Sequence, residues 1–213
     1  MREILEIIAD IRGRLKEHGD WFDSVEPGLP NAFNTMFNHI TLILELLSHY
    51  YRIWSRAPPY VDEAKIMRMR RENAERVLEI TKWAFISALS SMEYALKELL
   101  KASDRAVSIQ QLQRLRRELL EGKKVYLRNI VKSCRAVGII DDEQYKVWEC
   151  LIEVRNAVVH NNAVADKDAE YRIGNFTVTF SKGETLKGRL DFFVKLLQVA
   201  VEHYNKLLQA LLA

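Results

Sequence analysis

The sequence predicts an all-α protein with one small β-hairpin near its C-terminal end. All four prolines lie within the first 59 residues, so none interrupts a helix in the rest of the chain. Start and stop signals suited to helices recur along that remainder. The segment YRIGNFTVTF at 171–180 differs, because a Gly-Asn pair precedes an alternating, β-branched run. This pattern predicts a hairpin with its turn near 174–175.

The helices are expected in seven segments: 2–18, 30–55, 61–102, 108–121, 124–137, 142–161 and 187–212. Ser108 and Gln111 have the spacing of a capping box for the fourth segment. Gly138 is suited to end the fifth, because glycine adopts the left-handed conformation common after helices. Asp141 or Asp142 can cap the start of the sixth.

Composition indicates a globular protein of the cytoplasm. Hydrophobic residues make up 48% and charged residues 29% of the chain, and the net charge of +3 permits an anionic partner without requiring one. Cys134 and Cys150 lie 16 positions apart without a CxxC pair, which predicts buried free thiols. The first residues, MREILEIIADIR, contain acids and do not form a secretory signal. No apolar run is long enough to span a membrane.

Basic residues concentrate between Arg114 and Arg135, where acids are few. Such a stretch can follow a nucleic-acid backbone, and it can equally be the solvated face of a helix. The candidate RNA-binding residues within it are Lys123, Lys124, Arg128, Lys132 and Arg135.

The helix predicted at 142–161 ends in RNAVVHNN, which begins at Arg155. At about 100° per residue, Arg155 lies among apolar residues, where a permanent cation must be paired or used. His160 lies about 140° further round the helix. The residues on the apolar side are Trp148, Leu151, Ile152, Val158 and Val159, and those near His160 are Glu149, Glu153 and Asn156. A buried salt bridge, with Glu93 as candidate partner, would explain Arg155 structurally, and capping of the helix end would explain His160.

The run Arg155-Asn156-Ala157-Val158-Val159-His160 resembles the hallmark of the HEPN superfamily, an Arg, a polar residue, three further residues and a His near a helix end. The segment WAFISALSSMEYALKELL resembles the earlier HEPN helix that carries an acid, here Glu93. The resemblance covers roughly residues 80–212. It implies a HEPN-like antiparallel helical bundle, with the hairpin inserted between the motif helix and the last helix. The domain is expected at 58–213, and residues 1–57 as a helical extension packed on it.

The resemblance also implies a metal-independent endoribonuclease of toxin or defence type, with no cofactor. The RNA 2′-hydroxyl would attack the neighbouring phosphorus, with His160 as base or acid and Arg155 stabilising the phosphorane. Asn156 would orient the imidazole or a phosphate oxygen, and Glu93 would orient Arg155 or hold the His tautomer. Because one motif supplies a single His, a homodimer is expected to complete the site.

Alternatives remain open at the level of sequence. HEPN toxins with a nucleotidyltransferase antitoxin often have Tyr two residues after the His, where this chain has Asn162, so an antitoxin of that kind is doubtful although an antitoxin protein remains possible. The domain can instead be a non-catalytic HEPN module that binds nucleotide, RNA or a partner protein, or a purely structural helical dimer. Tyr126 and Trp148 can stack on bases, but core packing suits Trp148 better.

Overall fold

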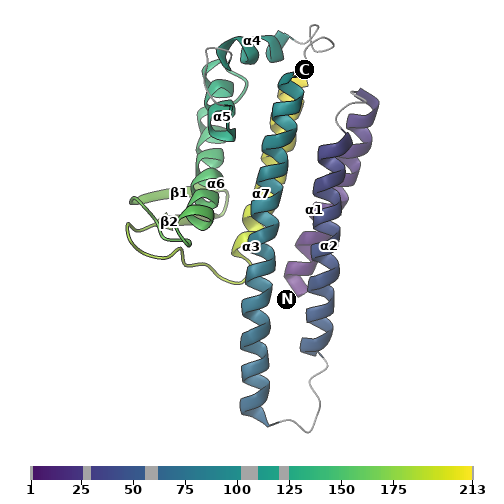
Figure 1. Ribbon diagram of the computed structural model, residues 1–213, viewed down its shortest axis with the longest axis vertical. Helices are drawn as coiled ribbons and strands as arrows, with labels where there is room; N and C mark the ends of the chain where they lie inside the picture. Colours follow the sequence, from purple (N-terminus) through teal and green to yellow (C-terminus); the bar gives the residue numbers. More distant parts are fainter. Residues whose placement is uncertain (1, 26–29, 56–61, 102–109, 120–124, 213) are drawn as a thin grey trace. The chain divides into compact units, whose positions relative to one another are not determined.

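The computed structural model describes residues 2–25, 30–55, 62–101, 110–119 and 125–212. Within these ranges the regular elements are helices and one antiparallel hairpin before the last helix, as predicted (Figure 1), with an isolated bridge between Val164 and Thr185. The elements are α1 (Arg2–Val25), α2 (Pro30–Ser55), α3 (Glu63–Lys101), α4 (Gln110–Leu119), α5 (Leu127–Ala136), α6 (Asp142–His160), β1 (Ala169–Ile173), β2 (Phe176–Phe180) and α7 (Phe192–Leu212).

Two predicted helix ends were wrong. Helix α1 continues through Gly19 to Val25, because one glycine within a helix costs only about 1 kcal/mol relative to alanine. Helix α7 begins at Phe192 rather than at residue 187. A Cβ atom on Gly188 would lie 2.6 Å from Cγ of Phe192, so the backbone approaches this ring more closely than any other residue type allows. The chain turns here before the helix starts.

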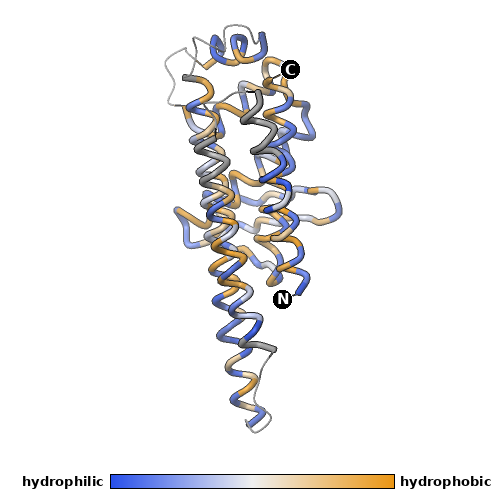
Figure 2. Tube along the Cα trace, turned by 90° about the vertical axis from the view of Figure 1, so that its right-hand side faces the viewer, coloured by the Kyte–Doolittle hydropathy of each residue, from blue (hydrophilic) through white to orange (hydrophobic). Residues whose placement is uncertain are grey.

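The first of two compact units comprises Met1–Ser91 and Gly188–Val199. Its helices α1 and α2 lie side by side (Figure 1). Each buries residues at intervals of four, three and four, which places them on one side of the helix. The buried residues are Ile4, Ile8, Ile11 and Leu15 on α1, and Met36, Ile40, Ile43 and Leu47 on α2. Accordingly, hydrophobic and hydrophilic residues interleave along the helices instead of forming separate blocks (Figure 2).

The second unit comprises Met92–Lys187 and Ala200–Ala213, and it contains the motif helix. Helix α6 packs against α5 and against β1. Trp148 and Tyr204 are its largest fully buried side chains. The hairpin pairs Ala169 with Phe180 through to Ile173 with Phe176, and its turn contains Gly174 at a φ of 56°. The predicted turn at 174–175 is therefore confirmed.

Local capping signals fix both ends of the connection between α5 and α6. Gly138 follows α5 with a φ of 77°, and the Ile139 N–H donates to the Cys134 carbonyl at 2.8 Å. This is the six-to-one hydrogen bond of a Schellman motif. At the start of α6, the Asp141 carboxylate accepts from the Gln144 N–H at 2.7 Å, and the Gln144 side chain accepts from the Asp141 N–H at 3.2 Å. Both predicted signals are confirmed.

Some predictions concern parts of the chain outside the described residues. The cap at Ser108 and the boundary near Pro58-Pro59 both lie there, so the division into 1–57 and 58–213 stays a prediction. No described helix combines the length and the apolar character needed to cross a membrane.

Candidate functional site

Arg155 is bound to the acid that the sequence indicated as its partner. Its guanidinium nitrogen Nη1 lies 3.4 Å from Oε2 of Glu93, which projects from α3 and is buried. Lys97, one turn further along α3, places Nζ 2.5 Å from the other carboxylate oxygen of Glu93. The Lys97 ammonium also lies 5.5 Å from the ring centre of Tyr126. The structural explanation for Arg155, a largely buried salt bridge, is thus confirmed.

Two cations share one carboxylate in this cluster. Glu93 pairs with both Lys97 and Arg155. Both cations keep part of their surface exposed. An approaching anion would therefore meet two partly exposed cations beside α6, in a setting of reduced dielectric where charge counts for more than in water.

His160 is the last residue of α6 and is exposed. Within the described part of the chain its side chain makes no hydrogen bond, so the predicted capping role is wrong: the backbone N–H of Asn161 satisfies the Ala157 carbonyl at 3.0 Å. No hydrogen bond joins His160 to Arg155, in keeping with their separation of about 140° around the helix. Asn156 is partly exposed on the His160 side. A single chain thus presents the two motif residues in different directions.

The backbone turns sharply just beyond His160. Asn162 and Ala163 have φ angles of 51° and 65°, in the left-handed region that residues other than glycine rarely adopt. The Ala163 N–H donates to the Ala157 carbonyl at 2.8 Å, which folds the chain back over the end of α6. Each such residue costs about 1–2 kcal/mol, although Asn tolerates the conformation better than Ala. This strain is located directly beside the candidate site.

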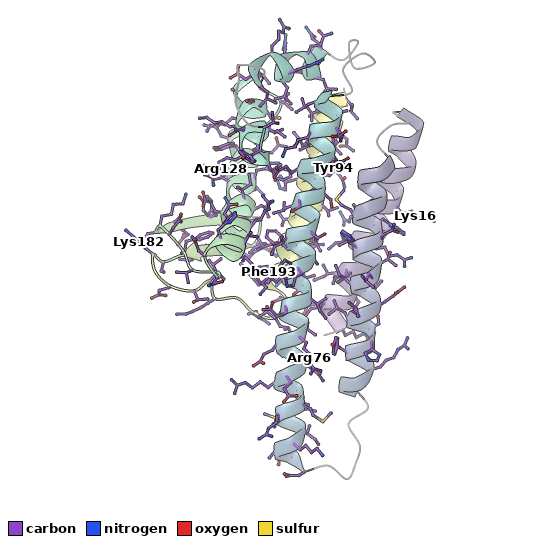
Figure 3. The ribbon with its side chains drawn as sticks, viewed as in Figure 1. Lys16, Arg76, Tyr94, Arg128, Lys182 and Phe193 are labelled. Atoms are coloured by element: carbon purple, nitrogen blue, oxygen red, sulfur yellow. The ribbon has the colours of Figure 1, made fainter. Side chains whose placement is uncertain are left out.

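A second buried carboxylate lies on the His160 side of α6. Oε1 of Glu153 accepts from Nη2 of Arg128 at 2.8 Å and from Nζ of Lys167 at 3.0 Å. Arg128 comes from α5 (Figure 3), and Lys167 from the segment between α6 and β1. Sequence reasoning placed Glu153 near His160 but gave it no role, and it missed Lys167. No local pattern links a lysine in a connecting segment to an acid 14 residues earlier.

The remaining candidate RNA-binding residues are in varied settings. Arg135 pairs one-to-one with Asp142 at 2.7 Å, and its guanidinium lies 4.7 Å from the ring centre of Tyr145. Lys132 is exposed. Lys123 and Lys124 fall outside the described residues. On α5, Arg128, Lys132 and Arg135 all reach solvent, as both the RNA-binding and the solvated-face interpretations require.

Burial decides between roles for the two aromatic candidates. Trp148 has 0% of its surface exposed, so the stacking role considered for it is wrong and core packing is right. Tyr126 is 52% exposed and remains accessible to a base. The two cysteines are buried free thiols as predicted, and burial raises the pKa of each to about 12.

Comparison of the chain with protein-family models, curated proteins and solved structures yields no match. The resemblance to the HEPN superfamily therefore depends on the motif residues themselves and stays a prediction. Among the residues placed by the structure, no three His, Cys, Asp or Glu side chains gather into a potential metal-binding group.

Proposed function

We propose that this protein is a metal-independent endoribonuclease of toxin or defence type, in which a 2′-hydroxyl attacks the adjacent phosphorus. The observation that carries the proposal is the presence of a restrained, partly exposed guanidinium and an accessible imidazole on one helix. Arg155 shares the Glu93 carboxylate with Lys97 and keeps part of its surface exposed, and His160 is exposed at the end of the same helix.

Each of these groups suits one part of the reaction. The phosphorane gathers negative charge, and a guanidinium offers planar donors that match its oxygens. Glu93 restrains Arg155, which reduces the conformational entropy lost when a phosphate is bound. An imidazole exchanges protons near neutral pH, so His160 can remove the proton of the 2′-hydroxyl or deliver one to the leaving 5′-oxygen. Asn156, on the same side, would orient the imidazole or a phosphate oxygen.

One chain supplies a base or an acid from His160, and the reaction needs both. The divergence of Arg155 and His160 also prevents one motif from surrounding a phosphate by itself. We therefore propose that two copies associate around a two-fold axis, so that each contributes its motif to a common site. RNA is the substrate and a second copy is the required partner, whereas an antitoxin protein remains a possible inhibitor.

The test is incubation of the purified protein with mixed RNA, with and without EDTA. Cleavage should survive chelation and leave a 2′,3′-cyclic phosphate or its hydrolysis product. His160→Ala and Arg155→Ala should each remove most activity, whereas His49→Ala and Arg71→Ala, which alter exposed residues of α2 and α3, should retain it. Activity that EDTA abolishes and magnesium restores would refute the mechanism.

A second candidate is a non-catalytic module that binds nucleotide, RNA or a partner protein. It is favoured by the Arg155–Glu93 salt bridge, since a guanidinium already held by a carboxylate can have a purely structural role. The two candidates differ in one measurement. If the dimeric protein binds RNA without cutting it, the protein is the binding module. If it cuts RNA in the presence of EDTA, it is the nuclease.

A further inference from the structure

The cluster around Glu153 joins three separate segments of the second unit. Glu153 comes from α6, Arg128 from α5 and Lys167 from the connection to β1. The carboxylate is nearly enclosed, with 10% of its side-chain surface exposed, whereas Arg128 retains 53% and Lys167 retains 46%. The acid is thus an internal anchor, and the two cations present their remaining N–H groups to solvent.

The charge of the cluster suits an anionic ligand. Both cations bind the same oxygen of one carboxylate, so the three groups carry −1 + 2 = +1. Glu149 lies one turn further from His160 on the same side of α6 and adds a negative charge near Lys167. Arg135 differs, because Asp142 neutralises it one-to-one. Arg128 therefore differs from Arg135, its neighbour on α5, because it shares its acid with a second cation.

The position of the cluster relates it to the candidate site. Glu153 and His160 are seven residues apart, which places them on the same side of α6 and about 10 Å apart along its axis. At about 3.4 Å per nucleotide of a stacked strand, this spacing corresponds to about three nucleotides. An RNA strand with its scissile phosphate at His160 would carry the phosphate about three nucleotides away to Arg128 and Lys167.

We propose that Arg128 and Lys167, positioned by the buried Glu153 carboxylate, form a phosphate-binding subsite for single-stranded RNA on the His160 side of α6. The inference rests on the proposed function, because it supposes that RNA lies along this surface. It assigns a binding role to Lys167 and a positioning role to Glu153. The alternative is that the cluster only links α5, α6 and the following segment.

The experiment measures binding in the absence of cleavage. A fluorescently labelled 2′-O-methyl oligoribonucleotide of mixed sequence lacks the attacking hydroxyl, so the intact protein can bind it but not cut it. Its affinity is measured by anisotropy from about 50 to about 200 mM salt. The variants are Arg128→Gln, Lys167→Gln and the double substitution. Arg14→Gln is the matched control, because Arg14 is 48% exposed and pairs with Asp10 in the first unit.

Each single variant should lower the steepness of the salt dependence by about 0.7 in the log–log slope, and the double variant by about 1.4. Arg128→Lys should keep the slope, since it retains the charge. Arg14→Gln should leave it unchanged. Far-UV circular dichroism identifies any variant that has lost its fold. If the double variant is unfolded, the single substitutions test the subsite, because each leaves Glu153 one cation.

The outcomes separate this inference from the proposed function. If the protein cuts RNA but the Arg128 and Lys167 variants keep the wild-type slope, the subsite is refuted and the nuclease stands. If the slope falls equally in Arg14→Gln, the effect is one of overall charge and the subsite is refuted as well. If the variants lose slope as expected but the protein cuts no RNA, the subsite stands and the nuclease fails.

Discussion

Glu153 is buried, whereas its partners Arg128 and Lys167 are largely exposed. Removal of the acid and removal of the two cations should therefore change the stability of the protein by different amounts. Glu153→Gln removes the charge at the centre and leaves two cations that are 53% and 46% exposed and can be solvated by water. The glutamine can still accept a hydrogen bond, so the loss is that of a largely exposed ion pair, about 1 kcal/mol. For a chain of this size that corresponds to about 2–4 °C in Tm.

Removal of the two cations should destabilise the protein much more than removal of the acid. Arg128→Gln combined with Lys167→Gln leaves a carboxylate that is 10% exposed with neither of its cations. An uncompensated buried charge costs about 3–5 kcal/mol. We expect about 3 kcal/mol here, the lower end, because the glutamine amides can still donate to the carboxylate.

Urea denaturation of wild type, Glu153→Gln and the double variant, followed by circular dichroism, measures both values. Arg14→Gln with Lys16→Gln is a control with the same change in net charge at exposed positions, and it should stay within about 0.5 kcal/mol of wild type. Equal losses in Glu153→Gln and the double variant would refute the reasoning from burial. A double variant as stable as the wild type would show that the carboxylate does not depend on these cations.

Three further predictions concern other parts of the chain. Cys134 and Cys150 should not react with a thiol reagent near pH 8 until denaturant is added, because burial raises the pKa of both to about 12. Ala163→Gly should stabilise the protein by about 0.5–1 kcal/mol by relieving a φ of 65°, and Gly138→Ala, at a φ of 77° with open space around it, should destabilise it by about 1–2 kcal/mol. Burial lowers the pKa of His203 below its ordinary value of 6.5. The stability that the neutral imidazole contributes is therefore complete above pH 6.5 and is lost as the pH falls through the lower pKa of the folded protein. His203→Gln should make the decline in Tm on acidification less steep.

Each of these predictions has a contrary result. Rapid labelling of native protein would mean that the thiols are reached through local opening. A glycine at position 163 that destabilises the chain would mean that the left-handed turn holds no strain worth relieving. If His203→Gln leaves the acid decline of Tm unchanged, other groups cause that decline.

Signals confined to a few neighbouring residues were sufficient for much of the fold. The glycine after α5, the aspartate before α6 and the Gly-Asn pair of the hairpin each act on backbone groups within about six residues. Such interactions are encoded where they occur, so the sequence predicts them directly. The start of α7 was missed although it also involves near neighbours, because the close approach of Gly188 to the ring of Phe192 is a matter of packing and not of a capping signal.

The candidate site divides in the same way. The sequence by itself placed a permanent cation, Arg155, among apolar residues, and helical spacing with the cost of burying charge is enough for that inference. Glu93 as its partner came from the resemblance to the HEPN helix that carries an acid. Only the tertiary structure decided that Lys97 shares Glu93 with Arg155, and that Glu153 gathers Arg128 and Lys167. The ion pair between Arg155 and Glu93 spans 62 positions in the chain. Contacts between distant segments depend on how whole helices pack, and that packing is the sum of many weak contacts that no short stretch of sequence contains.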